Sequence, residues 1–433
     1  MVSIKEARDA VANYLFGIDK ENVTCVYIGH KRVGGLDTGV PAIVIGLVKK
    51  KPFNEVPAGK LIPISVHFMG ALFPTDVVET GKIYALGVLP AQASDPSRTQ
   101  KNRPAPPGVS VGHYKITAGT FGFVAIEKGT GREVAVSNEH VFTAVTVDNS
   151  TQKGDLILQQ GKYDGGVSPD NDWAKLEKWG GLHTNTANYY DAAYAVPINK
   201  EDMSKPFYEL GKYPTKWREL EDIGGTLIKD GRSCGVKTGT VIGISVQVQV
   251  DYGRFVITFY EQIMTDAMLI PGDSGSAILD ANDYSVLIGL GFAGSNTVSI
   301  INPIKFILEG REPHTTLGIE LPPSIPKKYL PSESDAASVK VRKVGEAPSA
   351  ITVKPDKTEY YEGETINVSG KLTDGVTGEG IAARDVIVTW DGNEIETSTD
   401  VSGNFNVGFT APPVPSGQTE LILTLKSKFL GDP

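Results

Sequence analysis

The sequence predicts a mostly β, multidomain protein, and three observations favour this class. The chain has 433 residues, which exceeds the roughly 250–300 residues at which a single hydrophobic core stops growing, so two or three domains are expected. It contains 48 glycines and 27 prolines, a composition that suits a turn-rich β protein better than a helical one. Much of the chain consists of short apolar runs separated by Gly, Asn and Asp, which is typical of β-sandwiches and β-barrels.

Residues 1–90 are expected to form a small α+β N-terminal domain. Apolar residues recur at helical spacing near the start, and strand-like runs follow, separated by a Gly-rich turn. The expected elements are one amphipathic helix and four strands, at 3–16, 23–28, 42–48 and twice between 61 and 86. Residues 91–108 are rich in Pro, Ser and Arg, and we interpret them as a linker that wraps onto the next domain.

Residues 109–312 are predicted to form a second, all-β domain. Short strands with turn signals between them recur along this stretch, as in a sandwich or a barrel. The predicted strands lie at 120–126, 133–136, 155–158, 192–196, 239–250, 254–259, 276–279 and 286–292. A terminal helix is expected at 304–308.

The remainder of the chain is predicted to hold a linker and a third domain. Residues 313–349 are expected to be a semi-rigid linker, because five prolines lie among Ser, Lys and Glu at 321–349. Residues 350–433 offer strands and one candidate for a buried tryptophan, Trp390, and they resemble the immunoglobulin-like (Ig-like) β-sandwich modules of prokaryotic surface and phage proteins. The predicted strands lie at 350–353, 365–372, 386–390, 404–409 and 420–426.

Charge and composition exclude several kinds of partner. The net charge is −9, and residues 347–433 hold six Lys or Arg against thirteen Asp or Glu, so this part is expected to present a solvated acidic surface. The chain has no basic stripe for nucleic acid and no run of about 18 apolar residues for a membrane span. Cys25 and Cys234 lie far apart, so we expect two free thiols rather than a disulfide. No cofactor and no metal are expected.

The first residues of the sequence bear on its location. They lack the apolar core of a secretory signal. A cytoplasmic protein is therefore expected, unless a leader is missing from this sequence. Association with a particle or a surface is the alternative.

Residues 272–276, Gly-Asp-Ser-Gly-Ser, hold the candidate nucleophile, Ser274. A serine needs a base that takes its proton and donors that stabilise the oxyanion of the intermediate. Glycines permit a tight turn in which backbone N–H groups converge, because no side chain blocks them. The N–H groups of Gly272 and Ser274 are the candidate oxyanion hole.

This segment, followed by apolar residues, resembles the nucleophile motif of the trypsin-like (chymotrypsin-fold) serine proteases. The resemblance implies a double β-barrel protease core with the chain order His, Asp, Ser. His140 follows a strand–turn–strand pattern similar to the family's base motif, which implies that it is the general base. Asp191 opens a strand of small residues and resembles the acid that orients the base. The spacings, 51 residues from His140 to Asp191 and 83 from Asp191 to Ser274, are compatible with two consecutive barrels.

The same resemblance implies a substrate pocket and a closing helix. Met268 stands where the family places the pocket floor, and no Asp appears there to hold Lys or Arg. The Gly/Ala-rich residues Gly291, Phe292 and Ala293 resemble the strand that forms the pocket wall. A small or apolar residue before the cut bond is therefore expected. Residues 103–108 and 231–235 suggest a prokaryotic branch that is also related to the narrow-leaf-type proteases of plants.

Several residues compete for these roles. His113 is the main rival for the base, because it lies in the same β-rich block, and Asp172 has a local pattern similar to that of Asp191. The remaining histidines, which fit the base position less well, are His30, His67, His183 and His314. Residues 32–35, Arg-Val-Gly-Gly, are similar to the activation site of digestive proteases but lie too far before His140, so a Gly turn is expected.

The expected function is that of a serine endopeptidase acting on protein or peptide substrates through an acyl-enzyme. A latent or partner-regulated enzyme is one form of this hypothesis, with residues 1–90 or 91–108 covering the cleft. The alternative is a binding or assembly protein that keeps the protease fold, with the N-terminal and Ig-like domains docking partners. The sequence carries no indication of the oligomeric state.

Overall fold

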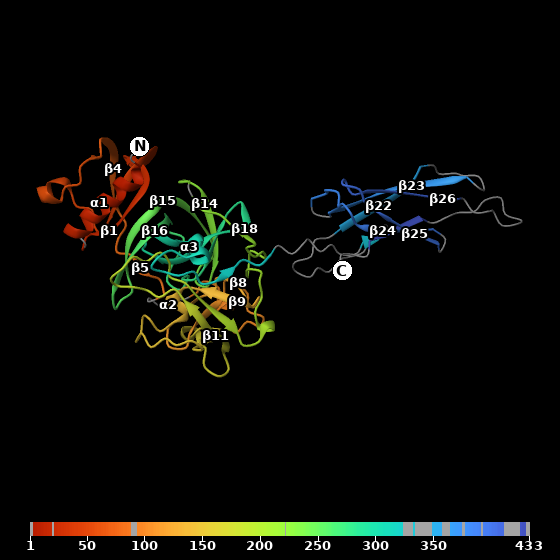
Figure 1. Cartoon of the computed structure of the whole chain (residues 1–433), viewed down its shortest axis with the longest axis horizontal. Coiled ribbons are helices and arrows are strands. Elements are labelled where there is room, and N and C mark those ends of the chain that lie inside the picture. The colour runs from red at the N-terminus through yellow and green to blue at the C-terminus, as the bar shows by residue number, and fades with distance from the viewer. Residues whose placement is uncertain are drawn as a thin grey trace, which may run out of the picture. The chain divides into compact units, whose positions relative to one another are not determined.

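The computed structural model divides the chain into two compact units, Met1–Pro323 and Ser324–Pro433 (Figure 1). The predicted mostly β class is confirmed, since strands dominate both units. The residues that the structure describes are 3–19, 21–87, 93–220, 222–323, 332–333, 349–356, 364–374, 377–390, 393–410 and 425–429.

The first unit begins with helix α1 (Ile4–Ile18). A capping box starts the helix: the Ser3 hydroxyl accepts the Glu6 N–H, and the Glu6 carboxylate accepts the Ser3 N–H at 2.8 Å. Its buried face, which includes Leu15, packs on the strands that follow. These strands are β1 (Val23–Val33), β2 (Leu36–Leu47), β3 (Ser65–Phe68) and β4 (Ala71–Glu79).

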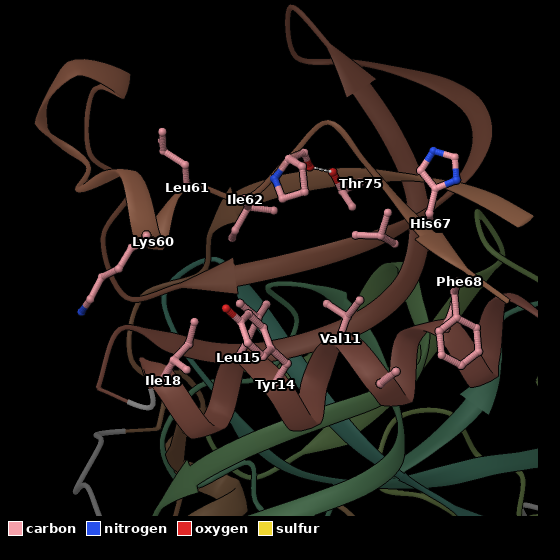
Figure 2. Close-up of a pocket in the computed structure, with 15 residues that line it drawn as sticks. Val11, Tyr14, Leu15, Ile18, Lys60, Leu61, Ile62, His67, Phe68 and Thr75 are labelled. Carbon is pink, nitrogen blue, oxygen red and sulfur yellow. Dashed lines mark hydrogen bonds between the residues drawn. The ribbon is translucent and has the colours of Figure 1, made fainter. Parts of the chain in front are cut away.

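A hollow of about 370 Å³ lies beside α1 (Figure 2). Figure 2 shows Val11 and Tyr14 of the helix on one side of this hollow, with Ile62 and His67 on the other. Its lining is largely apolar. No residue of the candidate active site described below contributes to it.

The N-terminal strands belong to the same hydrogen-bonded sheet as the second half of the unit. Strand β1 pairs antiparallel with β15 (Gly235–Asp251), with Cys25 opposite Val248. Side chains from both strands fill one buried apolar cluster, which includes Tyr27 of β1 and Val246 of β15. The segment predicted as an N-terminal domain is therefore joined to the rest of the unit by backbone pairing as well as by its core.

Residues 110–197 form a closed six-stranded barrel. The strands pair in the order β8, β9, β12, β11, β10, β6 and β7. Strand β7 runs on into β8 after two residues, so these two count as one strand, and their continuity closes a ring of six. Their bounds are β6 (Ser110–His113), β7 (Gly119–Thr120), β8 (Phe123–Glu127), β9 (Glu133–Ser137), β10 (Leu156–Leu158), β11 (Asp172–Trp179) and β12 (Ala193–Pro197). Strand β20 (Ile319–Glu320) adds to the edge of β8.

A second six-stranded ring follows. Strand β14 pairs with both β15 and β17, so the order β14, β17, β18, β19, β16, β15 closes on itself. The remaining bounds are β14 (Thr226–Gly231), β16 (Val256–Asp266), β17 (Ala277–Asp280), β18 (Asp283–Gly294) and β19 (Val298–Pro303). Two short strands pair with β18, β13 (Lys216–Trp217) and β5 (Tyr84–Ala85).

The two barrels share a buried apolar core. One cluster joins Phe123 and Val136 of the first barrel to Ala277 and Leu290 of the second. Full burial of a Val, Leu or Phe side chain contributes about 1.5–3 kcal/mol to stability. The predicted closing helix is present as α3 (Ile304–Glu309), and its Ile307 packs into the same cluster.

The second unit contains two antiparallel sheets with one common core. One sheet has the order β21-β27-β24-β25 and the other β22-β23-β26. Val388 of the first sheet and Val368 of the second belong to the same buried cluster, as in a sandwich. The strands are β21 (Ser332–Glu333), β22 (Ser349–Pro355), β23 (Thr365–Asp374), β24 (Asp385–Trp390), β25 (Asn393–Ser398), β26 (Asn404–Thr410) and β27 (Leu425–Phe429). The Trp390 side chain and residues 420–424 lie outside the described residues, and the Ig-like assignment stays a prediction.

Two expectations from the sequence concern the cysteines and membrane-spanning helices. Cys25 and Cys234 are both free. Among the described residues, helices long and apolar enough to cross a bilayer are not found.

Candidate active site

The three residues singled out by the sequence come from separate elements at the junction of the barrels. His140 lies in the short helix α2 (Glu139–Phe142), directly after β9 of the first barrel. Asp191 precedes β12 of the same barrel, and Ser274 lies in the turn before β17 of the second. All three side chains are buried.

These side chains form one hydrogen-bonded chain. The Nδ1 atom of His140 lies 2.5 Å from Asp191 Oδ2, and its Nε2 atom lies 2.8 Å from Ser274 Oγ. An ionised carboxylate only accepts, so Nδ1 carries the imidazole proton and Nε2 is left to accept the proton of the Ser274 hydroxyl. A serine in this position can act as a nucleophile, with the imidazole as its base.

Further bonds hold the Asp191 carboxylate in place. The backbone N–H of His140 donates to Asp191 Oδ1 at 3.1 Å, and the Tyr252 hydroxyl donates to Oδ2 at 2.6 Å. Burial, followed by the charge of Asp191, raises the pKa of Tyr252 well above its ordinary value, so this phenol keeps its proton. The Asn302 side chain accepts the Asp191 N–H at 3.0 Å. Sequence reasoning missed Tyr252 and Asn302, because no local motif marks either one.

Glu139, beside the base, is a buried carboxyl group. Its two oxygens accept the backbone N–H groups of Gly181, at 2.7 Å, and Leu182, at 3.1 Å. Burial, and then the charge of Asp191, raises the pKa of Glu139 to about 8. Through these hydrogen bonds, Glu139 holds Gly181 and Leu182 next to α2, the helix that carries His140.

The turn that carries Ser274 needs glycine on both sides. Gly272 has φ +88° and Gly275 has φ +92°, a left-handed region that other residues rarely adopt. A Cβ at Gly275 would also overlap the Ser137 hydroxyl and the Thr120 carbonyl. Thr120 N–H donates to the Ser274 carbonyl at 2.7 Å and thereby fixes the turn against the first barrel.

A buried ion pair also holds the Ser274 turn in place. Asp273 Oδ2 lies 2.8 Å from Lys229 Nζ, and both side chains are fully buried. Asp273 also accepts the N–H groups of Ser233, at 2.8 Å, and Ile270, at 3.2 Å. Burial alone would raise the pKa of Asp273, but the Lys229 charge and the hydrogen bonds from Cys234 Sγ, Lys229 and Ser233 N–H lower it below its ordinary value. Lys229 thus provides the charge partner of Asp273 from within the barrel.

Three of the four residues predicted to line the substrate pocket lie on one strand. Gly291, Phe292 and Ala293 belong to β18, and the Phe292 carbonyl lies 3.1 Å from Ser274 Oγ. Met268 is fully buried, and its N–H donates to Ser299 Oγ at 3.0 Å. Its apolar neighbours in the core include Leu269 and Ile278.

The chain itself occupies this cleft. Strand β5 pairs antiparallel with β18, and the next residue, Leu86, donates its N–H to the Phe292 carbonyl at 3.0 Å. The Leu86 carbonyl accepts the Gly272 N–H, also at 3.0 Å. The predicted oxyanion donor at Gly272 is therefore bound to a carbonyl of the protein's own chain. The sequence suggested a covering segment but did not single out this one.

The rival residues lie elsewhere in the structure. The His113 Nε2 atom is 3.2 Å from Asp155 Oδ2, and burial lowers the pKa of His113. Asp172 accepts a hydrogen bond from Ser168 at 3.1 Å. His30 lies 3.1 Å from Asp37, and His67 lines the hollow of Figure 2. The rings of His183 and His314 meet edge to face, with centroids 5.3 Å apart.

Two closed barrels with Ser, His and Asp side chains bonded in series at their junction are the arrangement found in chymotrypsin-like serine proteases. No protein-family model matches the chain, and no curated protein matches it. Solved structures that are similar include Nocardiopsis protease (16% identity, 47% of this chain and 94% of that chain, TM-score 0.34), Thermobifida fusca protease A (14%, 47% and 93%, 0.33) and Cellulomonas bogoriensis chymotrypsin (14%, 50% and 98%, 0.31). These structural neighbours are serine proteases, and at such low identity they assign no role to any residue of this chain.

Proposed function

We propose that this protein is a serine endopeptidase, with Ser274 as nucleophile, His140 as general base and Asp191 as the orienting acid. The observation that carries the proposal is the continuous chain of contacts from Asp191 through His140 to Ser274, at 2.5 and 2.8 Å. Hydrogen-bond reach between nucleophile and base, with a third group that orients the base, is the requirement for this chemistry.

In the proposed reaction, Ser274 Oγ attacks a peptide carbonyl while His140 Nε2 takes the hydroxyl proton. The N–H groups of Gly272 and Ser274 stabilise the oxyanion, and loss of one such donor typically costs about 2.7–4 kcal/mol. The imidazolium then protonates the leaving amine, and water hydrolyses the serine ester. Asp191 stabilises the imidazolium, and Tyr252 holds Asp191 in place.

One observation favours a second candidate, a binding protein that keeps the protease fold. The Gly272 N–H already has a partner in the Leu86 carbonyl, so the cleft is filled in this structure. A permanently filled cleft would leave the protein without activity toward external substrates.

A fluorophosphonate probe separates the two functions, because it reacts only with an activated serine. We expect the full chain, or its Leu86→Asp variant in which the cleft is opened, to carry the adduct on Ser274 by peptide mapping. Ser274→Ala should abolish labelling. Ser276→Ala should retain it, because the Ser276 hydroxyl bonds to the Asp273 carbonyl and not to His140. A folded protein that stays unlabelled in both forms would favour the binding function.

A further inference from the structure

The segment in the cleft lies as a substrate would lie. We propose that the chain cuts itself between Leu86 and Gly87, and that the site selects leucine-type side chains before the cut bond. This inference rests on the proposed function of Ser274, and it adds the identity of a first substrate.

The backbone hydrogen bonds of residues 84–86 are the first observation that supports the proposal. Strand β5 extends the β18 edge antiparallel, with Ala85 opposite Ala293 and Tyr84 opposite Gly294. Addition of an extended peptide to a sheet edge is a general mode of peptide recognition. Leu86 continues this pairing, since its N–H donates to the carbonyl of Phe292, the same carbonyl that lies 3.1 Å from Ser274 Oγ.

The Leu86 carbonyl is bound by one of the two proposed oxyanion donors. It accepts the Gly272 N–H at 3.0 Å, within the 2.7–3.1 Å typical of an oxyanion donor. Of the contacts made by residues 83–87, this one would strengthen as the carbonyl oxygen becomes negative. The carbonyl is therefore held by a donor that favours attack on its carbon.

The side chain of Leu86 supports the leucine preference. It is 3% exposed and belongs to the apolar cluster that contains Met268, Leu269 and Ile301. Its Cδ1 atom lies beside Gly294 of the pocket wall, 3.8 Å from where a Cβ would stand. A Lys, Arg, Asp or Glu side chain among these apolar neighbours would lose its contact with water, which costs free energy.

Gly87 lies against the base. A Cβ at this position would stand 2.6 Å from His140 Nε2, closer than any side chain can approach. The Gly87 carbonyl also accepts the Thr117 hydroxyl at 2.9 Å, which fixes the residue after the bond. The amine that leaves from Gly87 thus lies beside the imidazole that has to protonate it.

The step balances as an ordinary hydrolysis. Ser274 Oγ bonds to the Leu86 carbonyl carbon, and His140 takes the hydroxyl proton. The bond from that carbon to the Gly87 nitrogen breaks, and His140 passes the proton to this nitrogen. Water then cleaves the ester, which leaves a carboxylate on Leu86, an amine on Gly87 and a free Ser274.

The products are expected to stay together. Residues 1–86 remain paired to the barrel through β1 and β15, and the new Leu86 carboxylate keeps its place in the pocket. The cut protein is thus inhibited by its own product until the N-terminal strands leave or the segment is displaced.

The test compares two Leu→Asp variants of the full chain. Leu86 is buried in the pocket, whereas Leu72 is 57% exposed on β4 and serves as the matched control. In wild-type protein and in Leu72→Asp, we expect fragments 1–86 and 87–433, with Gly87 as the new N-terminus by mass spectrometry. Ser274→Ala should stay in one piece. Leu86→Asp should not be cut at this bond, and its Ser274 should react with the probe about tenfold faster or more, because its cleft is open.

A second measurement uses peptides in trans, so that the proposal does not depend on one variant. The opened Leu86→Asp protein should cut a quenched peptide containing Ile-Tyr-Ala-Leu-Gly after Leu, about tenfold or more faster than the same peptide with Lys for Leu. If Ser274 reacts with the probe but wild-type chain stays whole and the two peptides are cut equally, the self-cleavage proposal is overturned while the proposed function stands. If neither form reacts with the probe, the proposed function itself fails.

Discussion

Replacement of Lys229 by Met tests whether the buried ion pair holds the Ser274 turn. The Lys229 ammonium lies 2.8 Å from Asp273, and neither side chain is exposed, so the substitution leaves a buried carboxylate without its counter-ion. Removal of one partner from such a pair typically lowers the free energy of unfolding by about 3–5 kcal/mol. We expect a loss of this size, together with slower labelling of Ser274, because Asp273 also positions Ile270 and Ser233.

Lys216→Met is the matched control. Its ammonium lies 2.9 Å from Asp283, almost the same distance, but the two side chains are 60% and 41% exposed. Exposed pairs contribute about 0.2–1 kcal/mol. Urea denaturation in the Ser274→Ala background, where self-cleavage cannot interfere, measures both variants. Equal losses for Lys229→Met and Lys216→Met would refute the reasoning.

The pH dependence of Lys229→Met gives an independent check. In the wild type the Lys229 charge contributes to a lowered Asp273 pKa, so the carboxylate stays ionised. Without the lysine, burial favours the neutral acid, and the folded variant gains a proton more readily than the folded wild type. Its stability deficit should therefore shrink as the pH falls. A deficit that stays constant with pH would show that Asp273 charge is not its cause.

Two further predictions concern the groups around His140. Tyr252→Phe removes the hydroxyl that donates to Asp191 at 2.6 Å and should slow Ser274 labelling about tenfold in the opened Leu86→Asp protein, whereas Tyr208→Phe, whose hydroxyl contacts Ser97, should not. For Glu139, whose pKa rises from 4.5 to about 8 on folding, the folded state keeps a proton that the unfolded state loses, so stability should fall as the pH rises through this window. Glu139→Gln should flatten that fall in urea midpoints; an unchanged slope would contradict the assignment.

The proximity of His140, Asp191 and Ser274 could be predicted because each lies in a local pattern. Two glycines flank the serine, a strand end precedes the histidine, and a run of small residues follows the aspartate. The spacing between them then fits two consecutive barrels. Strands were also predictable, since their short apolar runs end at turn residues.

The supporting residues could not be found in this way. Lys229 stands beside Asp230 inside a strand, and only the closed barrel shows that the lysine side chain turns inward to Asp273. Tyr252 reaches Asp191 from a hairpin 61 positions away. Leu86 stands in an ordinary apolar run. Its position beside Ser274 follows from the pairing of β5 with β18, and this pairing is not visible in the sequence.

The pairing of β1 with β15 also bears on what would follow a cut at Leu86. Without the N-terminal strands, the part of β15 between Ile244 and Val248 would expose unpaired N–H and C=O groups. Apolar side chains such as Val246 and Val248 would be exposed with them. Such an edge is a template for any other extended chain and promotes association between molecules. Residues 23–33 therefore protect the edge of β15 from pairing with other chains. If the fragment left, this edge would be free to pair with a strand from another molecule.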